Sequence, residues 1–228
     1  MISVDSATRL PVRVKMSLRD TLLAGAVELL TERGFHKLRM SDVAATAGVS
    51  RQTVYNEFGG KETLAHAVAL SRAHAYLDGV GAVLAASDDP VAGVKAAVRH
   101  TLDRTVEDPL LTSILTGINA TALFPFLHAP DRVTLRAAVE LISKHLRQQL
   151  PRMPPSATVF YAESIVRLTL SHLLLPSSSP AEAADSVTAI AATLLAPHLS
   201  AHAQRRRPAR GIAKPGGPRA SHLGGASN

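Results

Sequence analysis

A short stretch in which two helical patterns meet at a single glycine constrains the fold of this chain more than any other feature. Up to Ala47, apolar residues recur at the spacing of one face of a short helix. Gly48 follows directly, and glycine can adopt the left-handed conformation that ends a helix without steric cost. Ser50 is then well placed to cap a second helix, because its hydroxyl can accept a hydrogen bond from a free backbone N–H. The stretch therefore predicts two short helices joined by a sharp turn.

The second of these helices has an apolar back and a polar front. Val54 and Phe58 are four residues apart and face inward together. The other side carries hydrogen-bonding groups: Arg51, Gln52, Thr53, Tyr55 and Asn56. A helix of this kind, set at a sharp turn on its predecessor, can enter the major groove of DNA, where arginine and glutamine pair with base edges. Taken alone, the stretch fits an ordinary helical hairpin with a solvated polar face equally well.

A further break at Gly59-Gly60 is followed by Lys61 in the first turn of a long helix. A phosphate bound there would be stabilised both by the lysine and by the free N–H groups of the helix end. The simpler interpretation is a solvated lysine that costs roughly a few tenths of a kcal/mol beside the helix dipole.

These residues belong to a longer signature. It consists of Gly34-Phe35, Asp42-Val43-Ala44, Ala47-Gly48-Val49-Ser50, Val54-Tyr55, Phe58 and Lys61 through Leu64. With this signature the chain resembles the tetracycline-repressor (TetR) family of bacterial transcription regulators. The resemblance implies an all-α homodimer with an N-terminal DNA-binding domain and a larger C-terminal domain that binds a small effector and controls DNA affinity.

By position, the resemblance implies a set of DNA contacts. The predicted DNA-binding residues are Arg39, Ser41, Ser50, Arg51, Gln52, Thr53, Tyr55, Asn56 and Lys61. In this scheme Tyr55 and Lys61 contact phosphates, whereas Gln52, Thr53 and Asn56 lie nearest the bases. Two positions depart from the family pattern. Arg39 stands where a serine or threonine usually caps the first helix of the motif, and Glu57 stands where a histidine or tyrosine is usual. A carboxylate near DNA must point away, find a cation or accept from a cytosine amino group.

The formal net charge of +7 is concentrated at the two ends of the chain. Residues 201–228 hold six basic residues and no acidic one, and residues 1–61 hold nine basic and six acidic residues. Residues 62–200 hold ten basic and twelve acidic residues. This distribution is typical of a DNA-binding head, a mildly acidic effector-binding body and a basic tail.

The residue content argues against several other protein classes. There is no cysteine, so a disulfide framework, a thiolate zinc site and a cysteine nucleophile are all excluded. The ten histidines form no metal-ligand or catalytic pattern, and no glycine-flanked nucleophilic serine or phosphate-binding glycine loop occurs. We therefore expect no enzyme activity, no metal and no cofactor. Without a signal-peptide pattern or a long apolar run, we expect a cytoplasmic, nucleoid-associated protein with no membrane partner.

We predict an all-α chain in four parts. These are a mobile basic arm at 1–16, a helix-turn-helix DNA-binding domain of three helices at 17–62, an effector-binding and dimerisation domain at 63–200, and a disordered basic tail at 201–228. Outside the central motif, the helices are expected at about 17–33, 61–86, 91–107, 110–116, 131–150, 156–175 and 180–200. No segment has the alternation of a strand.

An effector pocket is expected among the helices between Val91 and Leu175. Its candidates are polar tips near apolar neighbours, together with aromatic wall residues: His100, Arg104, Asn119, Tyr161, Arg167, Phe124 and Phe126. Plain core packing is the competing interpretation for each of them. The apolar surroundings favour a lipophilic effector.

The last two helices have wide faces of small and branched residues, which suit close helix–helix contact. On the last helix these are Ala183, Ala184, Val187, Ile190, Ala191, Leu194 and Leu195. The resemblance implies that these two helices form a four-helix dimer interface. They could instead simply close the core of the monomer.

The sequence thus predicts a sequence-specific DNA-binding transcriptional regulator, acting as a repressor that a small effector releases from a near-palindromic operator. One alternative is a nucleoid-type protein that binds DNA without sequence preference. Another is a helical enzyme that carries the helix-turn-helix incidentally, which the missing catalytic pattern disfavours.

Overall fold

The computed structural model describes residues 17–119 and 132–206, and within these ranges every regular element is a helix. The helices are α1 (Leu18–Lys37), α2 (Met40–Ala47), α3 (Arg51–Phe58), α4 (Lys61–Ala85), α5 (Pro90–Glu107), α6 (Pro109–Thr116), α8 (Arg132–Gln149), α9 (Pro155–Leu174) and α10 (Pro180–Arg206). The predicted all-α class is therefore confirmed. The predicted arm at 1–16, the residues Phe124 and Phe126, and the tail beyond Arg206 lie outside the described residues.

The first helix begins and bends where the sequence signals it. Ser17 and Asp20 form a capping box, in which each side chain bonds the backbone N–H of the other. The helix was expected to end near Gly34. It continues to Lys37 across a kink, because Gly34 takes a φ of 72° that interrupts the regular turn. The kink turns the buried Phe35 into the core of the N-terminal part of the molecule.

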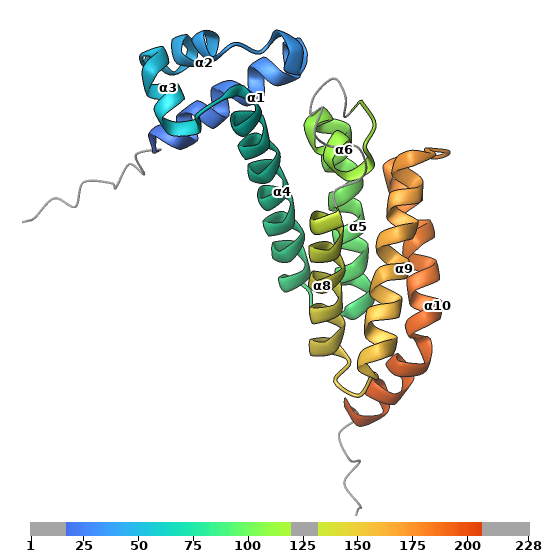
Figure 1. The fold of residues 1–228 in the computed structure, drawn as a ribbon. Helices are drawn as coiled ribbons and strands as arrows, with labels where there is room; N and C mark the ends of the chain where they lie inside the picture. Colours follow the sequence, from blue (N-terminus) through green and yellow to red (C-terminus); the bar gives the residue numbers. More distant parts are fainter. Residues whose placement is uncertain (1–16, 120–131, 207–228) are drawn as a thin grey trace, which may run out of the picture.

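The buried residues form two clusters, one in a head and one in a body (Figure 1). The head consists of α1, α2 and α3, and the body of α5, α8, α9 and α10. The long α4 leaves the head and runs down the side of the body, over roughly 37 Å at 1.5 Å per residue. The short α6 lies at the end of the body that faces the head.

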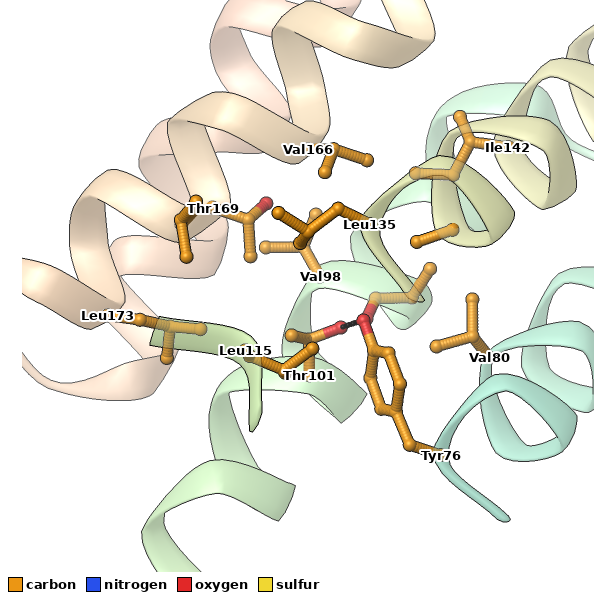
Figure 2. A pocket seen from close by; sticks show the side chains of 13 residues that line it. Tyr76, Val80, Val98, Thr101, Leu115, Leu135, Ile142, Val166, Thr169 and Leu173 are labelled. Atoms are coloured by element: carbon orange, nitrogen blue, oxygen red, sulfur yellow. Dashed lines mark hydrogen bonds between the residues drawn. The ribbon is translucent and has the colours of Figure 1, made fainter. Parts of the chain in front are cut away.

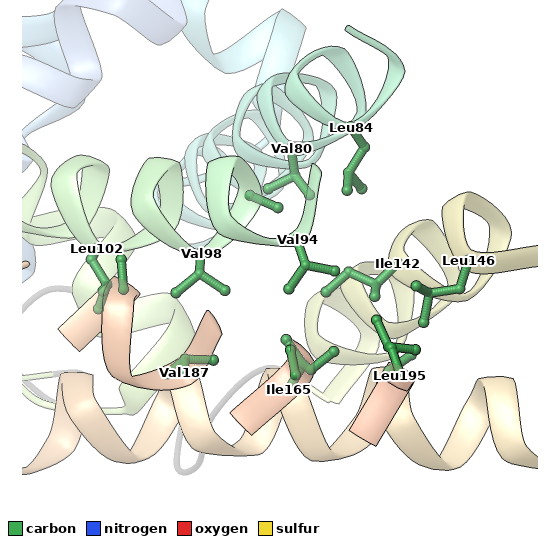
Figure 3. Packing of buried hydrophobic residues seen from close by; sticks show 14 of the residues in the cluster. Val80, Leu84, Val94, Val98, Leu102, Ile142, Leu146, Ile165, Val187 and Leu195 are labelled. Atoms are coloured by element: carbon green, nitrogen blue, oxygen red, sulfur yellow. The ribbon is translucent and has the colours of Figure 1, made fainter. Parts of the chain in front are cut away.

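The body cluster draws on five long helices that pack side by side. Figure 3 shows Val94 of α5, Ile142 of α8 and Ile165 of α9 converging on a single interior. Val187 and Leu195 of α10 close this interior from the outer side, and both have no exposed surface. Fully burying side chains of this size stabilises a fold by about 1.5–3 kcal/mol each before the entropy cost of ordering them.

The head cluster does not stop at the predicted boundary between residues 62 and 63. It includes Leu64, Val68 and Ala73 from the first half of α4, and it also includes Leu110 and Ile114 from α6. The head therefore completes its core with side chains from elements that were assigned to the body.

The last helix differs from the sequence interpretation in two ways. Most of its apolar face is core of the monomer: Ala183, Ala184, Val187, Ala191 and Leu195 are all buried. Only Ile190, which is 45% exposed, and the partly buried Leu194 remain from the set proposed for the dimer interface. The helix also runs past Ser200 to Arg206, so residues 201–206 are helical where a disordered tail was predicted. No helix in the described ranges is long and apolar enough to span a membrane.

Candidate nucleic-acid interface and effector cavity

The turn between α2 and α3 has the geometry that its sequence predicts. Gly48 adopts the left-handed conformation with φ of 67°, and its N–H bonds the carbonyls of Ala44 and Ala45. The N–H of Val49 also bonds the Ala44 carbonyl at 2.9 Å. Ser50 then caps α3, accepting a hydrogen bond from the Thr53 N–H at 3.1 Å. Both ends of the turn are thus fixed by hydrogen bonds, and these set the angle between the two helices.

On the polar front of α3, Arg51, Gln52 and Asn56 are exposed, whereas Thr53 and Tyr55 are half-buried, and side chains of the front pair with one another. Its back is held by Val54, which has no exposed surface, and by Phe58, which is 4% exposed. On the front, the Gln52 amide donates to the Asn56 side-chain oxygen at 2.9 Å, and the Arg51 guanidinium donates to the Tyr55 hydroxyl at 3.2 Å. The Gln52 pair still leaves one amide N–H and the carbonyl oxygen free, which is the donor–acceptor set that recognises adenine.

Two further predicted residues, Arg39 and Ser41, lie at the start of α2 and not on α3. Arg39 occupies the cap of α2 and makes no side-chain capping bond, so the departure from serine or threonine does cost this helix its cap. Both Arg39 and Ser41 are exposed beside the motif. The Ser41 hydroxyl donates a hydrogen bond to the Asp42 carboxylate, which also accepts one from the Arg33 guanidinium at 3.2 Å.

Lys61 is held against α1. Its ammonium group donates to the His36 carbonyl at 3.3 Å and lies 4.3 Å from the centre of the Phe35 ring. A cation at the last carbonyls of α1 is stabilised by the helix dipole. To contact a phosphate, Lys61 has to leave these two partners.

Glu57 forms an ion pair with Arg19. The Arg19 guanidinium of α1 lies 2.6 Å from its carboxylate and 4.7 Å above the Phe58 ring. The negative charge on the recognition surface is thereby balanced within the protein, and Arg19 is held at the side of α3.

The body contains a cavity among α4, α5, α6, α8 and α9 (Figure 2). Its lining is Tyr76, Val80, Ala97, Val98, Thr101, Leu115, Leu135, Ala138, Ile142, Val166, Thr169, Leu170 and Leu173. The free volume is about 30 Å³, which holds no more than a water molecule or two. The Tyr76 ring reaches from α4 across to the Thr101 hydroxyl of α5, with 3.2 Å between the two oxygens. Burial raises the pKa of Tyr76, so the phenol stays neutral.

None of the predicted pocket residues that the structure describes lines this cavity. His100 comes closest, because its ring stacks on Tyr76 with 6.5 Å between centroids. Arg104 and Arg167 pair with acidic neighbours on their own helices, and Asn119 is exposed. Tyr161 lies beside His198 of α10. The sequence search selected polar tips, whereas the cavity is built from aliphatic core residues and two threonines.

Tyr76 is the cavity residue that the sequence analysis missed although the sequence contains a signal for it. It lies between Ala73 and Val80 on the apolar face of α4, and this spacing turns its hydroxyl into the bundle. A tyrosine on such a face needs a buried partner for its hydroxyl, which is how it could have been found.

One helix contacts both the head core and the cavity. On α6, Leu110 and Ile114 belong to the head cluster, whereas Leu111 and Leu115 belong to the body cluster. Leu115 also lines the cavity. The helix starts at the buried Asp108, which accepts hydrogen bonds from the N–H groups of Leu110 and Leu111, both at 3.1 Å.

Asp108 also ties α6 to α4. Its second carboxylate oxygen lies 3.5 Å from the Arg72 guanidinium, whose Nε is buried with no hydrogen-bond partner. The link joins the long helix that carries the head to the helix that walls the cavity. Movement of either helix therefore strains the contact with the other.

Comparison with known proteins gives two family matches. Residues 22–68 match the model described as bacterial regulatory proteins of the tetR family, and residues 89–193 match the model described as the C-terminal domain of the bacterial tetracycline repressor. The HTH-type transcriptional regulator AlkX of Mycobacterium tuberculosis is 32% identical over 210 residues, which cover 88% of this chain and 97% of that protein.

Solved structures agree with these matches. The TetR family repressor AlkX from a Dietzia strain, described as implicated in biodegradation of n-alkanes, is 25% identical with a TM-score of 0.56, covering 79% of this chain and 97% of that one. A TetR-family regulator of Mesorhizobium loti has the same fold at 20% identity, with a TM-score of 0.59 over 78% of this chain and 95% of its own. The predicted family resemblance is thereby confirmed.

Proposed function

This chain belongs to the TetR family of DNA-binding transcription regulators, and from that premise we propose that it is a repressor of a near-palindromic operator, released by a small lipophilic effector. The observation that carries the proposal is the construction of α3. Its back is locked by Val54 and Phe58, its start is fixed by Ser50, and its front presents an exposed row of hydrogen-bonding groups. We place its action on the bacterial chromosome in the cytoplasm, where such an operator lies.

In this proposal Gln52, Thr53 and Asn56 read base edges. Arg39, Ser41, Ser50, Arg51, Tyr55 and Lys61 contact the backbone or the flanks of the site. The exposure of Gln52 and Asn56 supports the first group. The contact of Lys61 with α1 means that it reaches a phosphate only by exchanging the His36 carbonyl for it.

The sign of regulation rests on the relatives. The Dietzia protein is named a repressor and its match spans 79% of this chain. The transcriptional activator FasR of Mycolicibacterium smegmatis is 33% identical, but only over 85 residues, or 37% of this chain and 39% of that protein. The broader match favours repression. The relatives named here are transcription regulators, and none is an enzyme.

A homodimer is proposed through the outer faces of α9 and α10. The exposed apolar residues there are Val159, Phe160, Leu174, Leu175 and Ile190. The inner face of α10 is already used in the monomer, so these outer residues take the place of the set that the sequence suggested. A twofold interface would set the two α3 helices about 34–36 Å apart, or a multiple of that turn, on a palindromic site.

The proposed effector site is the cavity around Tyr76. Because the cavity holds only about 30 Å³, a larger molecule must push its walls apart, and Leu115 of α6 is one of those walls. The effector then has higher affinity for a widened body than for the form described here, which is the differential affinity that release requires. The apolar lining, together with a relative implicated in n-alkane biodegradation, supports a lipophilic effector.

A selection of genomic DNA fragments tests the proposal. The full chain and a version ending at Arg206, where α10 ends, are each incubated with sheared genomic DNA at near-physiological salt, and the bound fragments are sequenced. A shared near-palindromic site with both proteins is the expected result. Unrelated fragments that bind only when residues 207–228 are present would instead favour a nucleoid-type protein without sequence preference.

The role of Gln52 gives a finer test on the selected site. Gln52→Ala should cost about 1–3 kcal/mol at one base position and leave other positions unaffected. Lys61→Ala should weaken binding to all sequences and lower the salt dependence. The measurement is a binding titration against operators mutated one base pair at a time. An equal loss on every operator from Gln52→Ala would refute base reading.

A further inference from the structure

We propose that the effector of this protein is an uncharged amphiphile with one hydroxyl group, an alkanol-like molecule whose O–H donates to the oxygen of Tyr76 or of Thr101. This inference names the chemical class of the ligand and rests on the proposed function of the cavity as the effector site. It follows from the charges and the proton positions of the cavity wall.

The described part of the wall holds no charged group that could receive an ionised ligand. Among the described residues, ten of the thirteen that line the cavity are apolar, and the other three are Tyr76, Thr101 and Thr169. A carboxylate transferred into such a site leaves its charge unpaired, which costs several kcal/mol even after relaxation. The charged ends of Arg104 and Arg167 are engaged elsewhere and do not reach the cavity.

Each of the three hydroxyl groups in the wall already donates its proton in a hydrogen bond within the protein. The Thr101 hydroxyl donates to the Ala97 carbonyl at 2.8 Å, and a threonine has one hydroxyl proton to give. The contact of 3.2 Å between Tyr76 and Thr101 must therefore be a donation from the tyrosine to the threonine. Thr169 donates to the Ile165 carbonyl at 2.8 Å. The cavity thus offers lone pairs and no free proton.

A wall of this kind selects ligands by their hydrogen-bonding sense. An alcohol supplies the missing proton and leaves every existing bond in place. A ketone or an ether can accept a hydrogen bond from the wall only if Tyr76 gives up its bond to Thr101. An alkane leaves the lone pairs of Tyr76 and Thr101 unpaired in a dry site, which costs affinity relative to the alcohol. Once the walls have been pushed apart, the aliphatic lining does not distinguish among the alkyl chains of these ligands.

The test is equilibrium dialysis of radiolabelled ligands of equal chain length against the full-length protein. Decane, decanol, decanone and decanoate form one set, and hexadecane and its corresponding derivatives form a second. The expected order is the alcohol first, by roughly threefold to tenfold over the ketone and the alkane, with the carboxylate weakest. A carboxylate that binds more tightly than the alcohol, an alkane that equals it, or no binding in either set would overturn the proposal.

Two variants examine the proton positions. Tyr76→Phe removes one of the two acceptor oxygens and should lower the preference for the alcohol over the alkane without abolishing it, because the Thr101 oxygen remains. Thr101→Val removes the acceptor of the tyrosine proton, so Tyr76 becomes a free donor and the ketone should gain affinity relative to the alkane. Tyr161→Phe and Thr105→Val are matched controls, since neither residue lines the cavity, and they should keep the wild-type order. A Thr101→Val protein in which the ketone still binds no better than the alkane contradicts the assignment, and a gain in ketone affinity cannot arise from misfolding.

The same ligands added to the protein–operator complex separate the two proposals. An alcohol that binds in dialysis without releasing DNA would leave the ligand class standing and refute effector control. Release of DNA by the carboxylate alone would support effector control and refute the alcohol as the ligand class.

Discussion

At the scale of single residues, Glu57 shows how the head balances a negative charge beside the proposed DNA-binding surface. Its carboxylate lies 2.6 Å from Arg19, which is held in turn over the Phe58 ring. The pair is partly exposed, so its contribution to stability is small, about 0–1 kcal/mol. Its main effect is on charge, because it neutralises Arg19 beside α3, where the proposed DNA-binding surface lies.

We expect Glu57→Gln to bind DNA more tightly and with less sequence preference. The change removes a charge that phosphates repel and frees Arg19 to contact one, which should steepen the dependence of log affinity on log salt by up to about 0.9. Titrations of operator and random DNA at several salt concentrations measure this. Glu140→Gln is the control, because Glu140 is ion-paired with Arg147 in the body and should leave both slopes unchanged. Unaltered binding by Glu57→Gln would mean that Arg19 lies too far from the backbone.

The pH dependence of folding should reflect His145 of α8. This side chain is 4% exposed, and its Nε2 faces Gly93 of α5 without a hydrogen-bond partner. Burial lowers the pKa of His145, and the backbone of Asp89 and Pro90 opposes part of that shift. As the pH falls below the ordinary histidine pKa of about 6.5, the unfolded chain gains a proton that the folded chain refuses. The free energy of unfolding must therefore decrease.

Urea unfolding at about pH 7.5 and about pH 5.5 measures this loss around the ordinary histidine value. His145→Asn should reduce the difference between the two pH values. It should not abolish it, because burial also lowers the pKa of His100. An unchanged difference in His145→Asn would show that the histidine titrates alike in both states.

Several residue-level features could be predicted from the sequence, and the cavity could not. Gly48, Ser50 and Val54 act locally, through turn conformation, capping and helix spacing, so their roles follow from their neighbours in the chain. The partner of Tyr76 is 25 residues away on another helix. Whether a buried hydroxyl faces a neighbouring helix or a void depends on how the helices pack.

At the scale of elements, α6 is the short helix on which head and body depend together. Asp108 caps it and also faces Arg72 of α4. Asp89 provides a matched case, since it caps α5, is also followed by proline, and is exposed, with no ion pair to any described residue. A comparison of these two caps separates the cost of losing a cap from the cost of losing the link to α4.

We expect Asp89→Ala to lower the free energy of unfolding by about 1 kcal/mol, the usual value for a cap. Asp108→Ala should cost about 2–4 kcal/mol, because it also leaves Arg72 partly buried without its carboxylate. Asp108→Asn keeps the capping oxygen and should fall between the two. Urea unfolding of the three variants gives the values. Equal losses in Asp108→Ala and Asp89→Ala would show that the Arg72 contact adds nothing.

The sequence predicted where the helices begin and end more accurately than which face of each helix is buried in the monomer. Caps such as Asp89-Pro90 and Asp108-Pro109 mark helix starts through local chemistry. The face of α10 was assigned to a partner, yet its inner residues pack on α5 and α9 of the same chain. A helix with small apolar residues on most sides does not reveal which side the monomer covers.

At the scale of the whole molecule, dimerisation should depend on Ile190. This residue is 45% exposed and lies on the outer face of α10, away from the buried Val187, Ala191 and Leu195. Ile190→Glu would place a charge in a twofold contact, where it meets its own copy, and should yield a folded monomer. Val106→Glu is the control, because Val106 is 73% exposed on α5, away from that face.

Light scattering coupled to size-exclusion chromatography gives the mass of each variant. The monomeric variant should bind a single half-site weakly and lose the affinity gained from two linked contacts. An Ile190→Glu protein that remains a dimer would place the interface elsewhere.

The shared core of α4 and α6 has a consequence for engineering regulators. Builders of hybrid sensors join the DNA-reading part of one protein to the ligand-sensing part of another, and a natural cut here would be the Gly59-Gly60 turn. A transplant cut at that turn would leave behind Leu64, Val68 and Ala73, as well as Leu110 and Ile114, all of which the head uses for its core. A functional hybrid therefore has to include α4 through Ala73. It must also include α6, or replace the apolar contacts that Leu110 and Ile114 make with the head. The segment that folds as the DNA-binding head is thus discontinuous in the chain.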